Sequence, residues 1–412
     1  MNFSYFVAHR IIFRNTNQKG VSQPIITIAV LAIVIGVLMM IIAVATGIGL
    51  REKIREKIAA FNGHIIVSNF DNNQSDVSIT PIDKHLPVFE DITRTKGVRH
   101  LQAVITKAGI IRTESDFEGF ILKGVGQEYD FSFLKEYLVQ GNIPILNEQK
   151  ENAQVLISEY LADRMQLELG DKFTTHFLKE NPQEKPNLRQ FEIVGIYNSG
   201  FQDFDKNFII GDIRHIQKMN RWSENQVGNI EVFIDDFEQI SNKGNQIYEM
   251  IPHFLDAQTI EDKYFTIFEW LKITDSNIYL IITLMLVVGI VNITVALLVL
   301  ILERTSMIGI LKALGATNWQ IRKIFLYNAL YLIAKGLLIG NAIGLVFLFL
   351  QKYFAPIKLD PKSYYVDKVP VYIHIDYFVY INVMVVVISL IVLLIPSYVI
   401  TRISPVKAIR FE

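Results

Sequence analysis

Four long runs of apolar residues divide the chain, and the segments between them are polar or mixed. The runs cover residues 25–50, 277–302, 325–350 and 377–400, and only the third contains a charged side chain. A helix of about 20 apolar residues is long enough to cross the hydrocarbon core of a bilayer. Every run exceeds that length, so the pattern predicts an α-helical membrane protein with four transmembrane helices.

The stretch ahead of the first run allows two interpretations. Residues 1–24 mix aromatic and aliphatic side chains with Arg10, Arg14 and Lys19, as an amphipathic segment in the membrane interface would. A basic start followed by an apolar run and Ala43-Val44-Ala45 also resembles a cleaved signal peptide. The apolar part of a signal peptide spans about 7–15 residues. The first run is much longer, so we favour a retained transmembrane anchor.

Residues 51–273 have a different character. Charges, prolines and turn residues return, and about 220 residues are enough for a separate hydrophobic core. We expect strands at residues 65–68, 104–112, 119–125, 155–157, 173–178, 191–197, 208–210 and 230–234. We expect one helix at 159–167, one after the strand 208–210, one that follows the strand 230–234 and ends at Met250, and one that begins at Asp262. These elements predict a large α+β domain inserted between the first and second transmembrane helices.

The segment between the second and third runs, residues 303–324, is too short for a domain. It starts at Glu303 and reads ERTSMIGILKALGATNW. Its apolar residues have the spacing of one helical face. They are Met307, Ile308, Ile310, Leu311 and Leu314. Arg304 and Lys312 add positive charge, and Gly315 marks a helix stop. The segment therefore predicts a short amphipathic helix, attached to two spans, that meets a motor.

The basic residues favour one orientation of the chain. Four spans place both termini on one side, and basic residues occur there before the first span, in 303–324 and in the tail at 401–412. The opposite loop, residues 351–376, holds four lysines, so the bias is modest. We expect both termini in the cytoplasm and the large domain outside it, because long domains cross the membrane largely regardless of charge.

Composition excludes several classes of function. The chain has 412 residues, 51% of them hydrophobic, a mean hydropathy of +0.30 and a net charge of −1, so nothing points to nucleic acid as a partner. It has no cysteine, which excludes disulfides and thiolate sites. Its eight histidines lack HExxH or HxxxH spacing, so we expect no metal. No GxxxxGKS/T phosphate loop occurs, and we expect no cofactor, no catalytic residue and no enzyme in this chain.

The third run carries a packing signal. Three glycines recur at every fourth residue, which lines them up on one helix face and lets a neighbour approach closely. They are Gly336, Gly340 and Gly344. The stripe serves either packing within the four-helix bundle, which we favour, or a contact with a second subunit. Lys335 is more typical of a side chain that extends to the interface than of a proton relay. Asn292 and Thr294 in the second run are candidates for hydrogen bonds across helices.

The chain resembles a known family over nearly its whole length, and three stretches carry the resemblance. Residues 5–10, YFVAHR, are similar to its opening, and residues 308–317, IGILKALGAT, closely resemble its cytoplasmic coupling motif. The stretch from Ile395-Pro396-Ser397 to Arg410 resembles its ending. The family is that of the lipoprotein-releasing ABC permeases, the LolC/LolE type, within the wider MacB/FtsX permease family. Met307 departs from it, since the family has an acidic residue there, so the resemblance does not extend to an ion pair at that position.

Architecture favours the lipoprotein-releasing branch. MacB-type efflux pumps carry a fused ATPase ahead of the first span, and residues 1–24 are too few to hold one. FtsX-type division proteins have an outer domain much smaller than residues 51–273. The loop at residues 364–370, YYVDKVP, also resembles the lipoprotein branch.

The resemblance implies a mechanotransmission transporter in the bacterial inner membrane. Two permease subunits, identical or paralogous, pair with two separate ATPase subunits, which bind ATP and magnesium. ATP binding pushes the helix that starts at Glu303 and expels an acylated protein from between the first and second spans. The expected path contains Met39, Met40, Val288 and Asn292. A soluble periplasmic carrier receives the lipoprotein.

The resemblance also implies a hairpin in the periplasmic domain that docks the carrier. The predicted hairpin at residues 173–197 lies at the matching place. Its tip is Asn181, Pro182, Gln183, Glu184, Lys185 and Pro186. Prolines stiffen this tip, although an exposed loop without a partner explains the same residues. Two alternatives remain open for the whole protein: an FtsX-like subunit that activates a periplasmic hydrolase, and MacB-like export of peptides or drugs with a separate ATPase.

Overall fold

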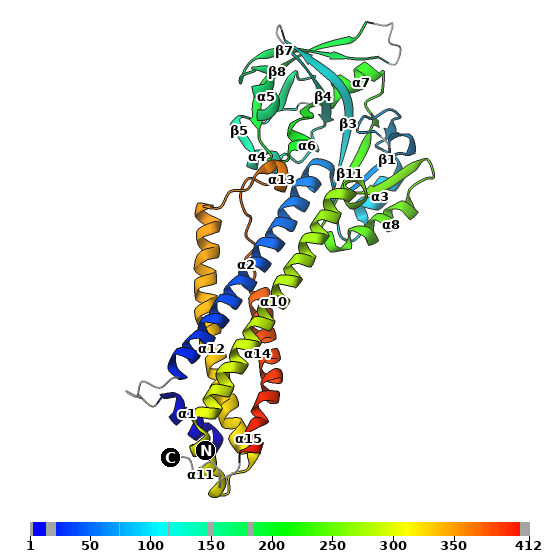
Figure 1. The fold of residues 1–412 in the computed structure, drawn as a ribbon. Coiled ribbons are helices and arrows are strands. Elements are labelled where there is room, and N and C mark those ends of the chain that lie inside the picture. The colour runs from blue at the N-terminus through cyan, green and yellow to red at the C-terminus, as the bar shows by residue number, and fades with distance from the viewer. Residues whose placement is uncertain are drawn as a thin grey trace. The chain divides into compact units, whose positions relative to one another are not determined.

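The computed structural model describes residues 3–13, 22–73, 75–113, 116–146, 151–179 and 185–403 (Figure 1). The chain divides into two compact units. The first comprises Met1–Arg51, Leu271–Lys358 and Val369–Glu412, and the second comprises Glu52–Trp270 and Leu359–Lys368. The chain therefore passes between the units four times.

Long helices build the first unit, and α2 and α10 continue from it into the second (Figure 1). The helices are α1 (Phe3–Phe13), α2 (Ser22–Asn62), α10 (Phe265–Glu303), α11 (Thr305–Ala313), α12 (Asn318–Phe354), α14 (Ile375–Ser397) and α15 (Val399–Arg402). Among the described residues, α2, α10, α12 and the α14–α15 stretch are long and apolar enough to cross a membrane. The four predicted transmembrane helices are confirmed.

The long helices do not end where the predicted apolar runs do, and two of the differences bear on the connecting segment and the fourth span. α12 begins at Asn318, so residues 318–324, which we assigned to the connecting segment, form the first turns of the third long helix. α14 ends at Ser397 instead of residue 400, directly after Pro396. Proline has no backbone N–H, and its ring clashes with the preceding turn, so the helix cannot continue regularly through it.

A mixed sheet of ten strands forms the centre of the second unit. Its strands are β1 (Ile65–Asn69), β3 (Val98–Arg112), β4 (Phe117–Val125), β5 (Leu138–Gly141), β6 (Gln154–Ser158), β7 (Lys172–Phe177), β8 (Asn187–Tyr197), β9 (Phe208–Asp212), β11 (Asn229–Ile234) and β12 (Leu255–Thr259). The order is β12-β1-β11-β3-β4-β9-β6-β8-β5, and β7 pairs with β3 and β8. The β4–β9 and β6–β8 pairs are parallel. A second sheet pairs β2 (Ile82–Asp83) with β10 (Gln226–Val227).

Short helices complete the second unit. They are η1 (Phe70–Asn72), α3 (Pro87–Arg94), α4 (Ser132–Glu136), α5 (Glu159–Met165), α6 (Gln202–Asp205), α7 (Ile213–Asn220), η2 (Phe237–Gln239), α8 (Ile240–Met250), α9 (Ile260–Lys263) and α13 (Pro361–Tyr364). α5 stops two residues earlier than predicted because Gln166 adopts the left-handed conformation, with φ 54°. The large α+β domain predicted between the first two spans is confirmed.

A buried ion pair holds the C-terminal end of α2 inside the second unit. The Lys123 ammonium on β4 lies 2.6 Å from a carboxylate oxygen of Glu231 on β11 and also donates to the Phe61 carbonyl in the last turn of α2. Gln102 Nε2 donates to the other Glu231 oxygen at 2.7 Å. A cation at this end interacts favourably with the helix dipole. Gly63 adopts φ +70° beside Glu231, which lets the chain turn from α2 into β1.

Residues 359–368 belong to the second unit, whereas the sequence predicts that they lie in a loop between the third and fourth spans. Lys57 Nζ, near the end of α2, donates to the Tyr365 carbonyl at 3.2 Å. The Tyr365 ring stacks on Phe201 with centroids 5.0 Å apart. The predicted loop at 351–376 is therefore not one connection, since its middle part folds with the large domain.

Candidate functional site

The connecting helix α11 ends in a motif that requires glycine. Gly315 adopts φ +93°, a conformation that other residues rarely accept. Its N–H donates to the carbonyl of Lys312, and the N–H of Ala316 donates to the carbonyl of Leu311, both at 3.0 Å. These two bonds form a Schellman motif, which satisfies the last carbonyl groups of a helix. The helix stops where the sequence predicts.

α12 starts directly after this stop. Thr317 occupies its N-cap, where Thr317 Oγ1 accepts from the N–H of Gln320 at 3.3 Å. In return, Gln320 Oε1 accepts from the N–H of Thr317 at 2.8 Å. This reciprocal pair is a capping box. Residues 314–317 are thus a short, hydrogen-bonded turn that joins α11 directly to α12.

The apolar residues of α11 divide between two faces. Ile308 is fully buried, and Met307 and Leu311 pack against the apolar core of the four long helices. Ile310 and Leu314 face away from that core and are 49% and 79% exposed. The prediction of one apolar face is wrong, because the bundle covers Met307 and Leu311 of that stripe and leaves Ile310 and Leu314 exposed. Ile310 and the C-cap residue Leu314 thus form an exposed apolar pair at the end of α11.

Glu303 and Arg304 form the junction between α10 and α11. Glu303 is the last residue of α10 and is exposed. Arg304 takes the N-cap of α11, and its carbonyl accepts from the N–H of Ile308 at 3.0 Å. Arg304 Nε is buried and has no hydrogen-bond partner in the described part of the chain. The junction therefore presents an exposed carboxylate beside a half-buried guanidinium.

Lys312 points toward the end of the fourth span instead of adding free positive charge to α11. Its Nζ donates to the carbonyls of Ile403 at 2.7 Å and Ile400 at 2.8 Å. The last carbonyls of a helix lack the usual donors. Lys312 supplies a donor to the Ile403 carbonyl and adds one to the Ile400 carbonyl, which also accepts from the N–H of Ile403 at 3.4 Å. Burial lowers the pKa of Lys312.

Arg322 in the first turns of α12 reaches the same region. Its Nε donates to Ser397 Oγ and its Nη2 to the Leu394 carbonyl, both at 2.9 Å. The guanidinium also lies 5.5 Å from the centroid of the Trp319 ring. From the sequence, Arg322 is only one of the basic residues of the segment 303–324. The Pro396-Ser397 pair was the signal that could have found it, because a helix interrupted by proline leaves carbonyls without donors.

The glycine stripe of α12 faces α2. A Cβ added at Gly336 would lie 2.6 Å from a methyl carbon of Ile33, and one at Gly340 would lie 3.0 Å from the Val34 carbonyl oxygen. A Cβ at Gly344 would come within 3.4 Å of an α2 side chain. The structure therefore uses the stripe for packing within the bundle, the alternative that we favoured.

The residues expected along the cargo path do not converge on one site. Met39 and Val288 are exposed, whereas Met40 is buried in the bundle core. Asn292 Nδ2 donates to the carbonyl of Val288 in its own helix at 2.9 Å, in place of a partner across helices. Met40 also lines a cavity of about 20 Å³ between α2, α10, α12 and α14. A cavity of this size holds about one water molecule, so an acyl chain does not fit there.

An amide pair between α12 and α14 was not predicted from the sequence. Asn341 Nδ2 donates to Asn382 Oδ1 at 2.7 Å, and Asn382 Nδ2 donates to Asn341 Oδ1 at 3.0 Å. In the bilayer core a polar side chain needs a protein partner because water is absent. Asn382 is the only asparagine of the fourth apolar run, and that isolated amide was the signal available.

The predicted docking hairpin consists of β7 and β8. Asn181, Pro182, Gln183 and Glu184 at its tip lie outside the described residues, whereas Lys185 and Pro186 are described and exposed. Leu178 and Leu188 beside the tip are also exposed. The hairpin thus presents apolar side chains, and its docking role stays a prediction.

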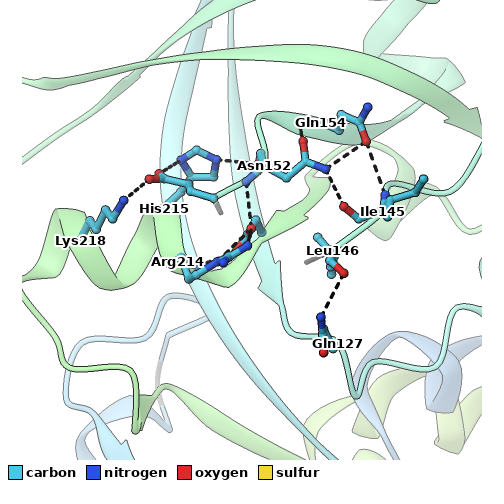
Figure 2. Close-up of polar contacts among 10 residues, drawn as sticks. Gln127, Ile145, Leu146, Asn152, Gln154, Arg214, His215 and Lys218 are labelled. Carbon is cyan, nitrogen blue, oxygen red and sulfur yellow. Dashed lines mark hydrogen bonds and ion pairs between the residues drawn. The ribbon is translucent and has the colours of Figure 1, made fainter. Parts of the chain in front are cut away.

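Figure 2 shows a polar network beside the base of this hairpin. The His215 ring meets Phe191 of β8 edge to face, with centroids 4.9 Å apart. His215 Nε2 lies 2.8 Å from the Asn152 carbonyl, and Nδ1 lies 2.5 Å from Glu151, which also pairs with Lys218. Burial lowers the pKa of His215. Both ring nitrogens face groups of the protein, so the network ties the segment before β6 to α7 and leaves no ring nitrogen for a substrate.

Two family models match the chain. Residues 26–247 match the MacB-like periplasmic core domain, and residues 279–405 match the FtsX-like permease C-terminal region. The first match takes in α2 and nearly all of the second unit up to α8, and the second takes in the remaining three spans with α11.

Several known proteins are similar to this chain. "Lipoprotein-releasing system transmembrane protein LolC" of Haemophilus influenzae is 23% identical and aligns over 100% of both chains. LolE of the same organism is 19% identical over 84% of this chain and 82% of its own. Among solved structures, the periplasmic region of MacB from Actinobacillus actinomycetemcomitans is 15% identical, with a TM-score of 0.33, over 49% of this chain and 91% of that chain.

The family resemblance inferred from the coupling and terminal motifs is confirmed by these matches. One family model covers more than half of the chain, and the other covers its C-terminal spans. The chain belongs to the MacB/FtsX permease family, with a MacB-like periplasmic core domain and an FtsX-like permease C-terminal region.

Proposed function

We propose that this chain is the permease subunit of an ABC transporter that releases lipoproteins from the bacterial inner membrane. Similarity to LolC along the full length of both chains supports this branch of the family. The observation that carries the mechanism is the exposed pair Ile310 and Leu314 on α11. A subunit that presses on this pair displaces a helix held by tight junctions between α10 and α12.

A separate ATPase supplies the force in this proposal. The sequence lacks the GxxxxGKS/T loop, so ATP and magnesium are bound by the partner. Two permease subunits, identical or paralogous, complete the transporter. Similarity to both LolC and LolE is compatible with either pairing.

The long helices then carry the displacement to the large domain. α2 and α10 run without interruption from one unit into the other, so a tilt of either helix acts on both units. The acyl chains of the cargo would lie against exposed apolar side chains of α2 and α10, among them Met39 and Val288. The cavity between the packed helices is too small to hold them.

Reconstitution tests the assignment. The chain, its ATPase and a second permease subunit are placed in proteoliposomes with an acylated lipoprotein, and transfer to a soluble carrier is measured with ATP hydrolysis. We expect ATP-dependent transfer. Stimulated ATP hydrolysis without transfer, combined with activation of a periplasmic hydrolase, would favour the FtsX-like alternative. Transfer of peptides or drugs instead would favour the MacB-like one.

The contact at α11 is tested by Leu314→Asp. A carboxylate on the exposed apolar pair should lower the stimulation of the ATPase by the permease about tenfold. A tenfold change corresponds to about 1.4 kcal/mol in the binding free energy between the two subunits. Leu314→Met is the matched control, since it keeps an apolar side chain of similar volume. Equal stimulation by both variants would show that the motor does not bind here.

We further propose that the β7–β8 hairpin docks the carrier. Exposed Leu178 and Leu188 beside the tip support an apolar contact. Removing residues 181–186 should weaken crosslinking to the carrier while ATP hydrolysis persists. Undiminished crosslinking would assign the carrier to another surface.

The proposed orientation places both termini in the cytoplasm and the large domain in the periplasm. The chain has no cysteine, so single cysteines report position cleanly. We expect Ser75→Cys, at an exposed position of the large domain, to react with an impermeant reagent from the periplasmic side and the exposed Asn318→Cys to react only after the membrane is opened. The reverse pattern would overturn the orientation.

A further inference from the structure

Side chains of the α11–α12 segment hold the end of the fourth span. α14 is interrupted after Pro396, and α15 adds only four residues. Two cations, one from α11 and one from the first turns of α12, point at this weakened helix end: Lys312 donates to the carbonyls of Ile400 and Ile403, and Arg322 donates to Ser397 Oγ and the Leu394 carbonyl. Both placements match the preference of helix C-termini for positive charge.

These contacts fix one register between the two elements. Lys312 and Ile400 are 88 residues apart in sequence, so no nearby chain connection keeps them together. Apolar residues of α11 and α15 share one core cluster, and apolar surfaces can slide over each other. Hydrogen bonds depend on distance and angle, so a charged donor between two carbonyls holds a defined position.

We infer that Lys312 is a positioning residue that passes the displacement of α11 to the fourth span, with Arg322 as a second contact from α12. The inference rests on the proposed function, in which a motor drives the permease through α11. The chain itself connects α11 to α10 and α12, the second and third spans. The contact of Lys312 connects α11 to the fourth span as well. Without Lys312, α11 still moves α10 and α12, but the fourth span follows incompletely.

Lys312→Met tests this role in the complete transporter. Methionine keeps the length and the apolar packing of the side chain but removes its donors. We expect ATP hydrolysis to stay within about twofold of wild type, while lipoprotein released per ATP falls about tenfold, the scale of a lost hydrogen bond from a charged group. Lys312→Arg should restore most of the release, because it returns a cationic donor.

Lys323→Met is the matched control. Lys323 lies next to Arg322 in the first turns of α12, and its Nζ lies 5.3 Å from the centroid of the Trp319 ring. It should leave the ratio of release to hydrolysis unchanged. A parallel loss of hydrolysis and release in Lys312→Met would show a general structural role and overturn the inference. If this variant fails to insert, Ser397→Ala removes only one acceptor of Arg322 and should lower the same ratio less.

A second readout does not depend on the cargo. Fluorescent labels are placed at Ile395→Cys in α14 and Leu302→Cys in α10, both exposed positions in a chain without cysteine. ATP binding by the complex should shift both labels in the parent protein, and Lys312→Met should abolish the shift at Ile395→Cys alone. Unchanged shifts at both positions would overturn the inference. Selective loss of the shift without any lipoprotein release would retain the inference and refute the proposed cargo.

Discussion

The two units of this protein hold their helices in different ways. In the second unit, the end of α2 is fixed by a buried charge pair, Lys123 and Glu231. In the first unit, α2 is fixed by close contact with the glycines of α12, and charged contacts such as that of Lys312 occur at helix ends. The same helix thus uses charge in the α+β domain and shape in the bundle. Burying a charge is tolerable where the sheet supplies partners, whereas a span surrounded by lipid has few.

The largest expected effect comes from breaking the buried charge pair. Lys123→Met leaves Glu231 buried without its counter-ion and removes the donor to the Phe61 carbonyl. Breaking one partner of such a pair costs about 3–5 kcal/mol. We expect the Tm of the second unit in the full chain to fall by roughly 10 °C, measured by thermal unfolding in detergent.

The double variant Lys123→Met/Glu231→Met is the control for this prediction. Replacing both partners of a buried pair by apolar side chains is often neutral, so stability should largely return. If the double variant is as unstable as the single one, the bond to the end of α2 matters more than the unpaired charge.

The pH dependence of stability tests the buried polar contacts of the second unit, and the expected effect is smaller. Burial lowers the pKa of His64, at the start of β1, to about 4, and its Nδ1 accepts from the N–H of Ile234 at 3.2 Å. The unfolded chain binds the proton more readily, with a pKa of about 6.5. Stability is therefore fully present above pH 6.5 and is lost as the pH falls toward 4, by about 2 kcal/mol at pH 5.

His64→Asn should remove the His64 share of this slope, because the amide oxygen can accept the same N–H without titrating, while His215, whose pKa burial also lowers, keeps its own share. The measurement is unfolding of the full chain by denaturant between pH 4 and pH 7, a range set by these pKa values. Replacing the exposed His253 by Asn is the matched variant and should keep the wild-type slope. A wild-type slope in His64→Asn would assign the acid sensitivity to another group.

The glycine contacts give a comparable test in the first unit. A larger side chain at Gly340 meets the Val34 carbonyl oxygen at 3.0 Å and Val37 Cβ at 3.1 Å. Overpacking of this kind costs about 1–3 kcal/mol, so Gly340→Leu should lower the stability of the bundle in detergent. Gly289→Leu is the matched control, because an added Cβ there meets nothing within 4 Å.

These contrasts also explain what the sequence could predict. Run length and spacing are local, so the four spans, the helix around Ile308 and the glycine face of α12 were predictable. The partner of that face, the Asn341–Asn382 pair and the target of Lys312 depend on contacts between distant residues. The predicted face of α11 failed for a related reason: spacing shows which residues are apolar, but neighbouring helices decide which are covered.

The smallest expected effect comes from a substitution at Gly315 that changes backbone strain but neither packing nor charge. Gly315 lies in open space, where an added Cβ would meet nothing within 4 Å, yet its φ is +93°. Gly315→Ala should therefore cost only the conformational penalty, about 1–2 kcal/mol, as loosening of the α11–α12 turn with the four spans intact. Hydrogen exchange of the Gly315 and Ala316 amides measures this opening, because both donate to α11 carbonyls. Exchange that stays at the wild-type rate would mean that the turn is held by its apolar contacts, and that the glycine is dispensable for the junction.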